Sequence, residues 1–215
     1  MEHLVTLALV ALSVAAPPPS TGLPIAGPDA ARLAEPAAPV DLEVPFACGA
    51  KVVVSQAHGT FSHVGTDRWA WDFRVPEGTP ILAAHDGVVR MVRSDSVRGG
   101  CDRSFGPEAN YVILANGKGQ ETQYLHFSKV FVKLGEQVVR GQVLGEVGRT
   151  GFSCGAHLHF QLQREGAAWA GQSVPARFRG IGDPDVDTEV VSDNCQSQLR
   201  TIEAKAEQAA QPSSR

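Results

Sequence analysis

Two histidines separated by a single residue, His157 and His159, form the most distinctive chemical motif in this sequence. They follow a glycine-rich turn and begin a segment, residues 157–163, in which polar and apolar residues alternate. Alternation with a period of two predicts a β-strand, and residues two apart in a strand share a face. We therefore expect both imidazoles on one face, with Leu158 and Phe160 in the core. Such a pair suits metal binding or acid–base chemistry once other residues join it.

Three further side chains could complete a site around this pair. A catalytic zinc ion takes three nitrogen or oxygen ligands and keeps one position open for water. His63, Asp72 and His159 can supply the ligands, and Asp72 stands among large apolar residues, where an unpaired carboxylate is unfavourable. His126 and His157 stand at predicted strand ends and could reach the open position as a base and an electrophile.

The segments that must position these residues read as short strands. Apolar runs alternate with glycine-rich turns, which predicts an all-β domain, mainly antiparallel sheet with hairpins and long loops. Asp86-Gly87 predicts a hairpin turn between residues 79–84 and 88–93, and Asn116-Gly117 predicts another. We expect the last strand at Val174–Phe178.

Composition restricts the class of protein. The 215 residues carry a formal net charge of −4 and no basic block, so nothing indicates a nucleic-acid partner. Four cysteines without CxxC spacing favour two disulfides and an oxidising compartment. We predict the pairs Cys101–Cys154 and Cys48–Cys195, which would join a long polar insertion to the turn before His157 and tie the start of the domain to its end.

Four regions are predicted along the chain: a signal-peptide-like segment (1–16), a Pro/Ala-rich linker (17–43), the folded domain (44–195) and a polar tail (196–215). The apolar run Leu4–Ala16 is too short for an ordinary transmembrane helix. We therefore expect an exported protein, secreted or periplasmic, that does not span the membrane. The sequence leaves the oligomeric state open, with a monomer as one option.

Taken together, these residues resemble a known family. The motifs, in order, are Ser62-His63, Asp72-Phe73-x-x-Pro76-x-Gly78-Thr79-Pro80, Tyr124-x-His126, Gly148-x-Thr150-Gly151 and His157-Leu158-His159-Phe160. The set is similar to the lysostaphin/LytM-type zinc endopeptidases, which cut peptidoglycan cross-links. The resemblance covers about residues 55–163, and its specificity lies in the whole set rather than in any one motif.

The resemblance implies Zn²⁺ as the cofactor, with His63, Asp72 and His159 as ligands. It implies His126 and His157 as the catalytic pair, and family analogy favours His157 as the base, although the residues themselves leave that choice open. The implied substrate is peptidoglycan peptide. A D-Ala cross-link is our first choice and a Gly-Gly bond our second, because nothing after Gln163 resembles a binding domain for a Gly-bridged wall.

Two departures from the family pattern bear on the site. Many relatives place the aspartate four residues after the first histidine, which is the position of Asp67. We favour Asp72, because it precedes the Pro-x-Gly-Thr-Pro motif and lies on a strand that leads into the sheet. Some relatives also have a tyrosine before the first ligand, whereas the only tyrosines here are Tyr111 and Tyr124.

Two other functions compete with an active peptidase as explanations of this sequence. Some LytM-type domains have lost zinc residues and activate a cell-wall amidase without catalysis; all five expected residues are present here, which favours the enzyme. A lipoyl-type carrier would need a lysine at a hairpin tip, and the corresponding tip is Asp86-Gly87. Zinc content of the purified protein separates the first hypothesis from the other two.

Overall fold

The structure is a computed structural model that describes residues 40–166 and 172–195. The expectations for the export-like segment, for the linker up to residue 39 and for the tail after residue 195 lie outside the described residues. The strands are Val40–Leu42 (β1), Lys51–Gln56 (β2), Trp71–Arg74 (β3), Pro80–Leu82 (β4), Gly87–Arg93 (β5), Gly99–Gly100 (β6), Tyr111–Ala115 (β7), Gln120–Leu125 (β8), Phe127–Val130 (β9), Gln137–Val138 (β10), Val143–Val147 (β11), Gly151–Phe152 (β12), His157–Arg164 (β13), Ala176–Phe178 (β14) and Glu189–Val191 (β15).

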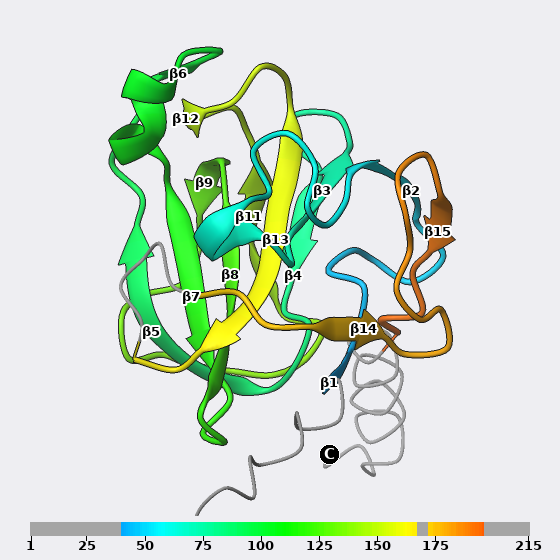
Figure 1. Cartoon of the computed structure of the whole chain (residues 1–215). Helices are drawn as coiled ribbons and strands as arrows, with labels where there is room; N and C mark the ends of the chain where they lie inside the picture. Colours follow the sequence, from blue (N-terminus) through cyan, green and yellow to red (C-terminus); the bar gives the residue numbers. More distant parts are fainter. Residues whose placement is uncertain (1–39, 167–171, 196–215) are drawn as a thin grey trace, which may run out of the picture. The chain divides into compact units, whose positions relative to one another are not determined.

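An eight-stranded antiparallel sheet forms the frame of the domain, in the order β10-β5-β7-β8-β13-β3-β2-β15 (Figure 1). A three-stranded antiparallel sheet, β4-β11-β9, and two short parallel pairs, β1-β14 and β12-β6, complete the described structure. Its only helices are two 3-10 turns, Gly65–Asp67 (η2) and Arg103–Glu108 (η3). The predicted all-β fold with mainly antiparallel strands is therefore confirmed. None of the described segments forms a helix long and apolar enough to cross a membrane.

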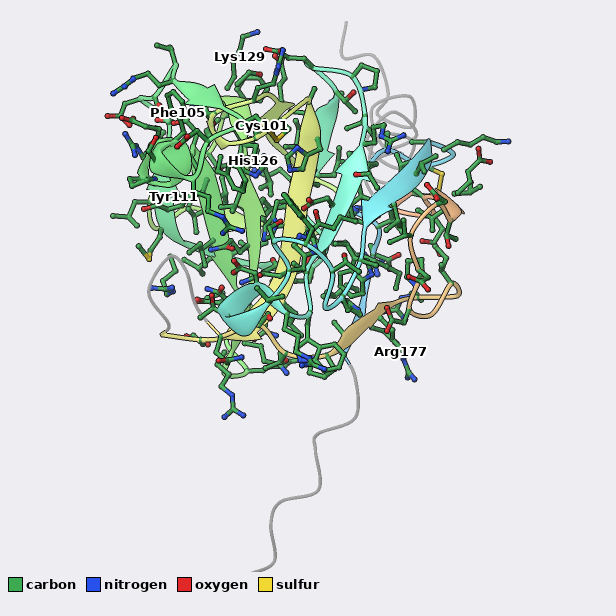
Figure 2. All side chains as sticks on the ribbon, turned by 45° about the horizontal axis from the view of Figure 1, so that its top comes forward. Cys101, Phe105, Tyr111, His126, Lys129 and Arg177 are labelled. Atoms are coloured by element: carbon green, nitrogen blue, oxygen red, sulfur yellow. A yellow bond between two sulfur atoms is a disulfide. The ribbon has the colours of Figure 1, made fainter. Side chains whose placement is uncertain are left out.

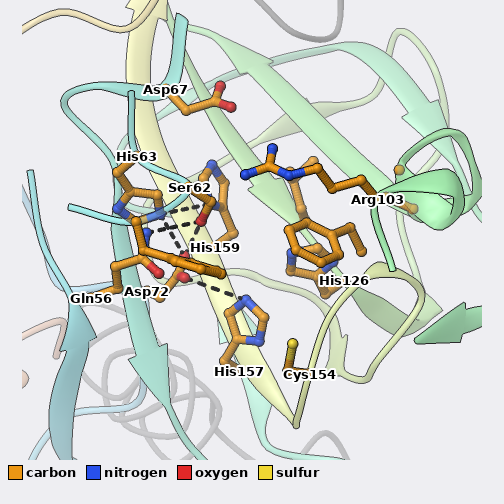
Figure 3. Close-up of a pocket in the computed structure, with 15 residues that line it drawn as sticks. Gln56, Ser62, His63, Asp67, Asp72, Arg103, His126, Cys154, His157 and His159 are labelled. Carbon is orange, nitrogen blue, oxygen red and sulfur yellow. Dashed lines mark hydrogen bonds and ion pairs between the residues drawn. The ribbon is translucent and has the colours of Figure 1, made fainter. Parts of the chain in front are cut away.

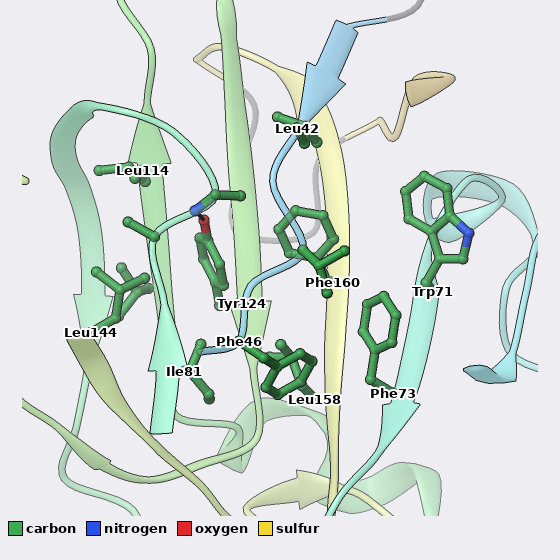
Figure 4. Close-up of a cluster of buried hydrophobic side chains, with 14 of the residues drawn as sticks. Leu42, Phe46, Trp71, Phe73, Ile81, Leu114, Tyr124, Leu144, Leu158 and Phe160 are labelled. Carbon is green, nitrogen blue, oxygen red and sulfur yellow. Dashed lines mark hydrogen bonds between the residues drawn. The ribbon is translucent and has the colours of Figure 1, made fainter. Parts of the chain in front are cut away.

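The core lies on one face of β13, as the alternation predicts. Leu158, Phe160 and Leu162 are buried there at 0% exposure, together with Tyr124 of β8 and Trp71 of β3 (Figure 4). Removing a large apolar side chain from water contributes about 1.5–3 kcal/mol. This burial fixes the register of the strand, since a shift by one residue would move every side chain to the other face. The histidines of β13 consequently face away from the core.

The two predicted hairpins have different outcomes. The Asn116-Gly117 hairpin is confirmed, because β7 and β8 pair across it and Gly117 adopts φ +67°. The Asp86-Gly87 hairpin is wrong, since β4 pairs with β11 while β5 pairs with β7 and β10. A Cβ on Gly87 would lie 2.3 Å from the carbonyl oxygen of Ala115. The glycine therefore permits close approach of a neighbouring strand rather than a tight reversal.

The ends of the domain also differ from expectation. Residues 40–42, which the sequence analysis assigned to the linker, form β1, and the next residue, Glu43, is buried. Val174–Phe178 is not the last strand: it yields the shorter β14, and β15 follows and joins the edge of the large sheet. The two strands that the sequence did not predict, β1 and β15, have only three residues each, too few to show a periodic pattern.

Both predicted disulfides are present. Cys48 bonds to Cys195, and Cys101 bonds to Cys154. The first closes the described domain on itself. The second fastens the insertion that contains β6 and η3 to the segment just before His157.

Candidate metal centre and catalytic pocket

Strand pairing brings the two central side chains of the site together. His159 of β13 lies opposite Asp72 of β3 in the antiparallel register, and its Nδ1 is 3.0 Å from Asp72 Oδ1. The loop before η2 adds His63, whose Nε2 is 3.0 Å from the same oxygen and 3.3 Å from His159 Nδ1 (Figure 3). All three residues are buried, and they are the one group in the described structure arranged to hold a metal ion.

The carbonyl partner of His63 fixes which nitrogen faces the cluster. Its Nδ1 lies 3.1 Å from the carbonyl oxygen of Ala57. Because a carbonyl only accepts, Nδ1 carries the proton, and Nε2 presents its lone pair to the site. Such a contact orients a metal-binding histidine.

The electrostatics of the cluster favour a charged Asp72. Burial alone would raise the pKa of Asp72, but the hydrogen bond from His159, the close contact with His63 and the charges of His159 and His157 hold that pKa well below its ordinary value. Burial alone would lower the pKa of His159, yet the hydrogen bond and charge of Asp72 raise it. The cluster is thus a buried carboxylate that attracts positive charge.

Two more histidines lie beside this cluster. The rings of His126 and His157 are 4.5 Å apart between centroids, and His157 Nε2 is 3.6 Å from Asp72 Oδ2. His126 Nδ1 donates to the carbonyl oxygen of Thr150 at 2.7 Å, and His157 Nδ1 donates to that of Gly155 at 2.9 Å. Each ring is therefore oriented by the backbone and keeps Nε2 free to meet another group.

His126 differs from His157 in its surroundings. Burial, reinforced by the nearby His157 and His159, lowers the pKa of His126 to about 3. Its backbone also adopts φ +72°, an unfavourable conformation for a non-glycine residue that is found mainly where the surroundings enforce it. The hydrogen bond from its backbone N–H to the carbonyl oxygen of Asn110, 3.0 Å long, is one such constraint.

An open pocket of about 300 Å³ gives access to all five side chains. Its size is at the lower end of the range for ligand pockets. Asp67 lines this pocket without joining the buried cluster, so the structure places Asp72, not Asp67, between the two histidines. Sequence reasoning missed Arg103, Phe61 and Phe152 in the lining, because they lie in a turn or in elements too short to carry a periodic signal.

A chain of polar side chains continues along β13 from the cluster. Gln161 follows His159 on the same face of the strand and donates to Gln163 Oε1 at 2.9 Å. Gln163 Nε2 donates to Glu121 Oε1 at 2.6 Å, and Glu121 accepts two hydrogen bonds from Arg90. An ion pair with a fully buried carboxylate therefore lies at the end of the polar row that begins at His159.

The remaining candidates have structural roles. His58 packs against Trp71 and pairs with Asp183, whereas His85 contacts Thr122. Tyr124 is buried in the core and does not line the pocket. His3 lies outside the described residues.

Comparison with known proteins gives a consistent result. Residues 66–170 match peptidase family M23. The chain is 42% identical over 100 residues to the peptidoglycan DD-endopeptidase ShyA of Vibrio cholerae serotype O1, a match that covers 46% of this chain and 20% of that protein. It is 36% identical over 98 residues to the glycyl-glycine endopeptidase ALE-1 of Staphylococcus capitis, covering 45% of this chain and 25% of that one.

A solved structure of similar type is the catalytic domain of the prophage-encoded M23 protein EnpA from Enterococcus faecalis. It shares 29% identity with this chain, covers 60% of this chain and 94% of its own, and superposes with a TM-score of 0.46. The chain spans a quarter or less of the length of the two curated relatives.

Proposed function

Because this chain carries a peptidase family M23 domain of the LytM/lysostaphin type, we propose that it is an exported zinc endopeptidase acting on peptidoglycan peptides. The observation that carries this proposal is the convergence of His63, Asp72 and His159 on one point, with His126 and His157 beside it in an open pocket.

The donor atoms fit zinc in kind and in spacing. Two imidazole nitrogens and one carboxylate oxygen are a common ligand set for catalytic zinc. Zinc–ligand bonds of about 2.0–2.2 Å would set the ligand atoms of a tetrahedral site roughly 3.3–3.6 Å apart. The donor atoms of His63, Asp72 and His159 lie 3.0, 3.0 and 3.3 Å apart, so one distance is at the lower end of that spacing and two are about 0.3 Å below it. When bound, zinc supplies Lewis-acid chemistry, acidifying water and polarising a carbonyl oxygen.

We assign His157 as the proton acceptor in the reaction. Its Nδ1–H is held by Gly155, so the lone pair on Nε2 can take a proton from an attacking water. The Nε2–H that results can hydrogen-bond the developing oxyanion or return the proton to the leaving amine. Burial lowers the pKa of His126 to about 3, so this side chain stays neutral near pH 7 and is not suited to take the proton from water.

The substrate proposal follows the curated relatives, with a D-Ala cross-link first and a Gly-Gly bond second. One relative is named a peptidoglycan DD-endopeptidase and another a glycyl-glycine endopeptidase. Two disulfides support an oxidising compartment outside the cytoplasm, in line with the apolar segment 4–16.

Digestion of purified sacculi tests this function. The zinc-loaded chain is expected to solubilise sacculi and release muropeptides cut at their cross-links, as identified by mass spectrometry. A chelator should stop the release, and added zinc should restore it. If the protein leaves sacculi and Gly-rich peptides intact while accelerating a separate amidase, the non-catalytic activator hypothesis replaces this one.

A further inference from the structure

One arginine side chain reaches the catalytic pocket. Among the described residues that line it, Arg103 is the single lysine or arginine. Figure 3 shows its guanidinium extending from η3 into the space between Asp67 and His126. The guanidinium carbon lies 5.4 Å from the centre of the Phe152 ring, another lining residue. Stacking of this kind leaves the N–H groups at the edge of the guanidinium available to a ligand.

The segment that carries Arg103 is fastened to the segment that carries His157. The Cys101–Cys154 disulfide joins them, and β6 pairs with β12. Asp102 caps η3 by accepting a hydrogen bond from the Ser104 N–H at 2.8 Å. Figure 2 shows Cys101 and Phe105 of this segment at the same end of the domain as His126, away from Arg177. Arg103 is therefore held at a fixed place relative to the catalytic pair.

We propose that Arg103 selects peptide bonds that have a free carboxylate beside them. A guanidinium forms paired, charge-assisted hydrogen bonds with a carboxylate, which a neutral amide cannot match. Asp67 on the pocket lining would repel a carboxylate, so the favourable position is at Arg103. The inference rests on the proposed peptidase function and narrows the choice of substrate. A Gly-Gly bond inside a bridge has no free carboxylate beside it, so it would gain nothing from Arg103.

The test uses one cross-linked muropeptide dimer in two forms, with its carboxylates free or converted to primary amides. For the zinc-loaded chain, kcat/KM is expected to be about tenfold higher on the free form, the lower end for a hydrogen bond to a charged group at a salt-screened site. Arg103→Gln should lower kcat/KM on the free form and remove most of the preference. Arg103→Lys should restore part of the preference for the free form, since lysine returns the positive charge but lacks the paired N–H donors of a guanidinium.

Arg98→Gln is the matched control. Arg98 lies in the same insertion and its substitution removes the same charge, but its side chain stacks on Phe105, pairs with Glu108 and does not line the pocket. The preference should survive in this variant. Equal losses on both dimers in Arg103→Gln, or an unchanged preference, would overturn the inference.

A binding measurement separates this inference from the peptidase function. Zinc-loaded His157→Ala protein keeps Arg103 and should leave the dimer intact, so calorimetry can compare both forms. About tenfold tighter binding of the free form, abolished by adding Arg103→Gln, supports selection by Arg103 even if the wild-type chain cleaves neither dimer. Equal binding of the two forms refutes it even if sacculi are digested.

Discussion

The ion pair between Arg90 and Glu121 offers a sharp test of how the site is supported. Glu121 is fully buried, whereas the Arg90 side chain is 27% exposed. Arg90 donates two hydrogen bonds to the carboxylate, and Gln163 donates a third at 2.6 Å. Removing the arginine therefore leaves the buried Glu121 carboxylate without this positive partner, whereas removing the carboxylate leaves an arginine that water can reach.

This asymmetry sets the expected magnitudes. Arg90→Met should lower the free energy of unfolding by about 3–5 kcal/mol, the cost of breaking a buried pair from one side. Glu121→Gln should cost about 1–3 kcal/mol, since it weakens hydrogen bonds without burying an unpaired charge. The double variant Arg90→Met/Glu121→Gln should cost less than the sum of the two single changes, because neither charge remains.

Urea unfolding followed by tryptophan fluorescence, with the disulfides oxidised, measures these differences. In a domain of this size the Arg90→Met loss corresponds to a Tm decrease of roughly 6–20 °C. Arg98→Met is the control, because its pair with Glu108 is exposed and should contribute about 0–1 kcal/mol. The reasoning fails if Arg90→Met costs no more than this control, or if the double variant shows simple additivity.

Three further outcomes are expected. Asp72→Asn should lose stoichiometric zinc in metal analysis while Asp67→Asn keeps it, and the reverse pattern would contradict the ligand assignment. His126→Ala and His157→Ala should keep zinc and fold but lower turnover about a hundredfold or more; near-normal activity in either would remove that residue from the mechanism. Burial lowers the pKa of His85, so the unfolded chain binds its proton first and stability falls as pH drops below about 6.5. His85→Gln should flatten the stability profile of the metal-free protein between about pH 7 and 5, and an unchanged slope would exclude this contribution.

Local pattern was sufficient for several features of this protein. The alternation in residues 157–163 predicted which face of β13 carries histidine and which enters the core, because successive strand residues point to opposite sides. The Asn116-Gly117 turn and both disulfides were also predicted. The five residues singled out by type and motif do meet in one pocket, while their chemical roles remain proposals.

Other features depended on contacts between distant parts of the chain. Asp86-Gly87 has the composition of a hairpin turn, but β5 pairs with β7, and this long-range pairing places β4 in another sheet. Asp67 and Asp72 both suit the sequence motif; the register that sets Asp72 opposite His159 distinguishes their positions. Arg103 carries no signal in the sequence, because its place in the pocket comes from the disulfide and strand pairing of its insertion. Periodicity reports only which way a side chain points within its own strand, whereas strand order and cross-links determine what it meets.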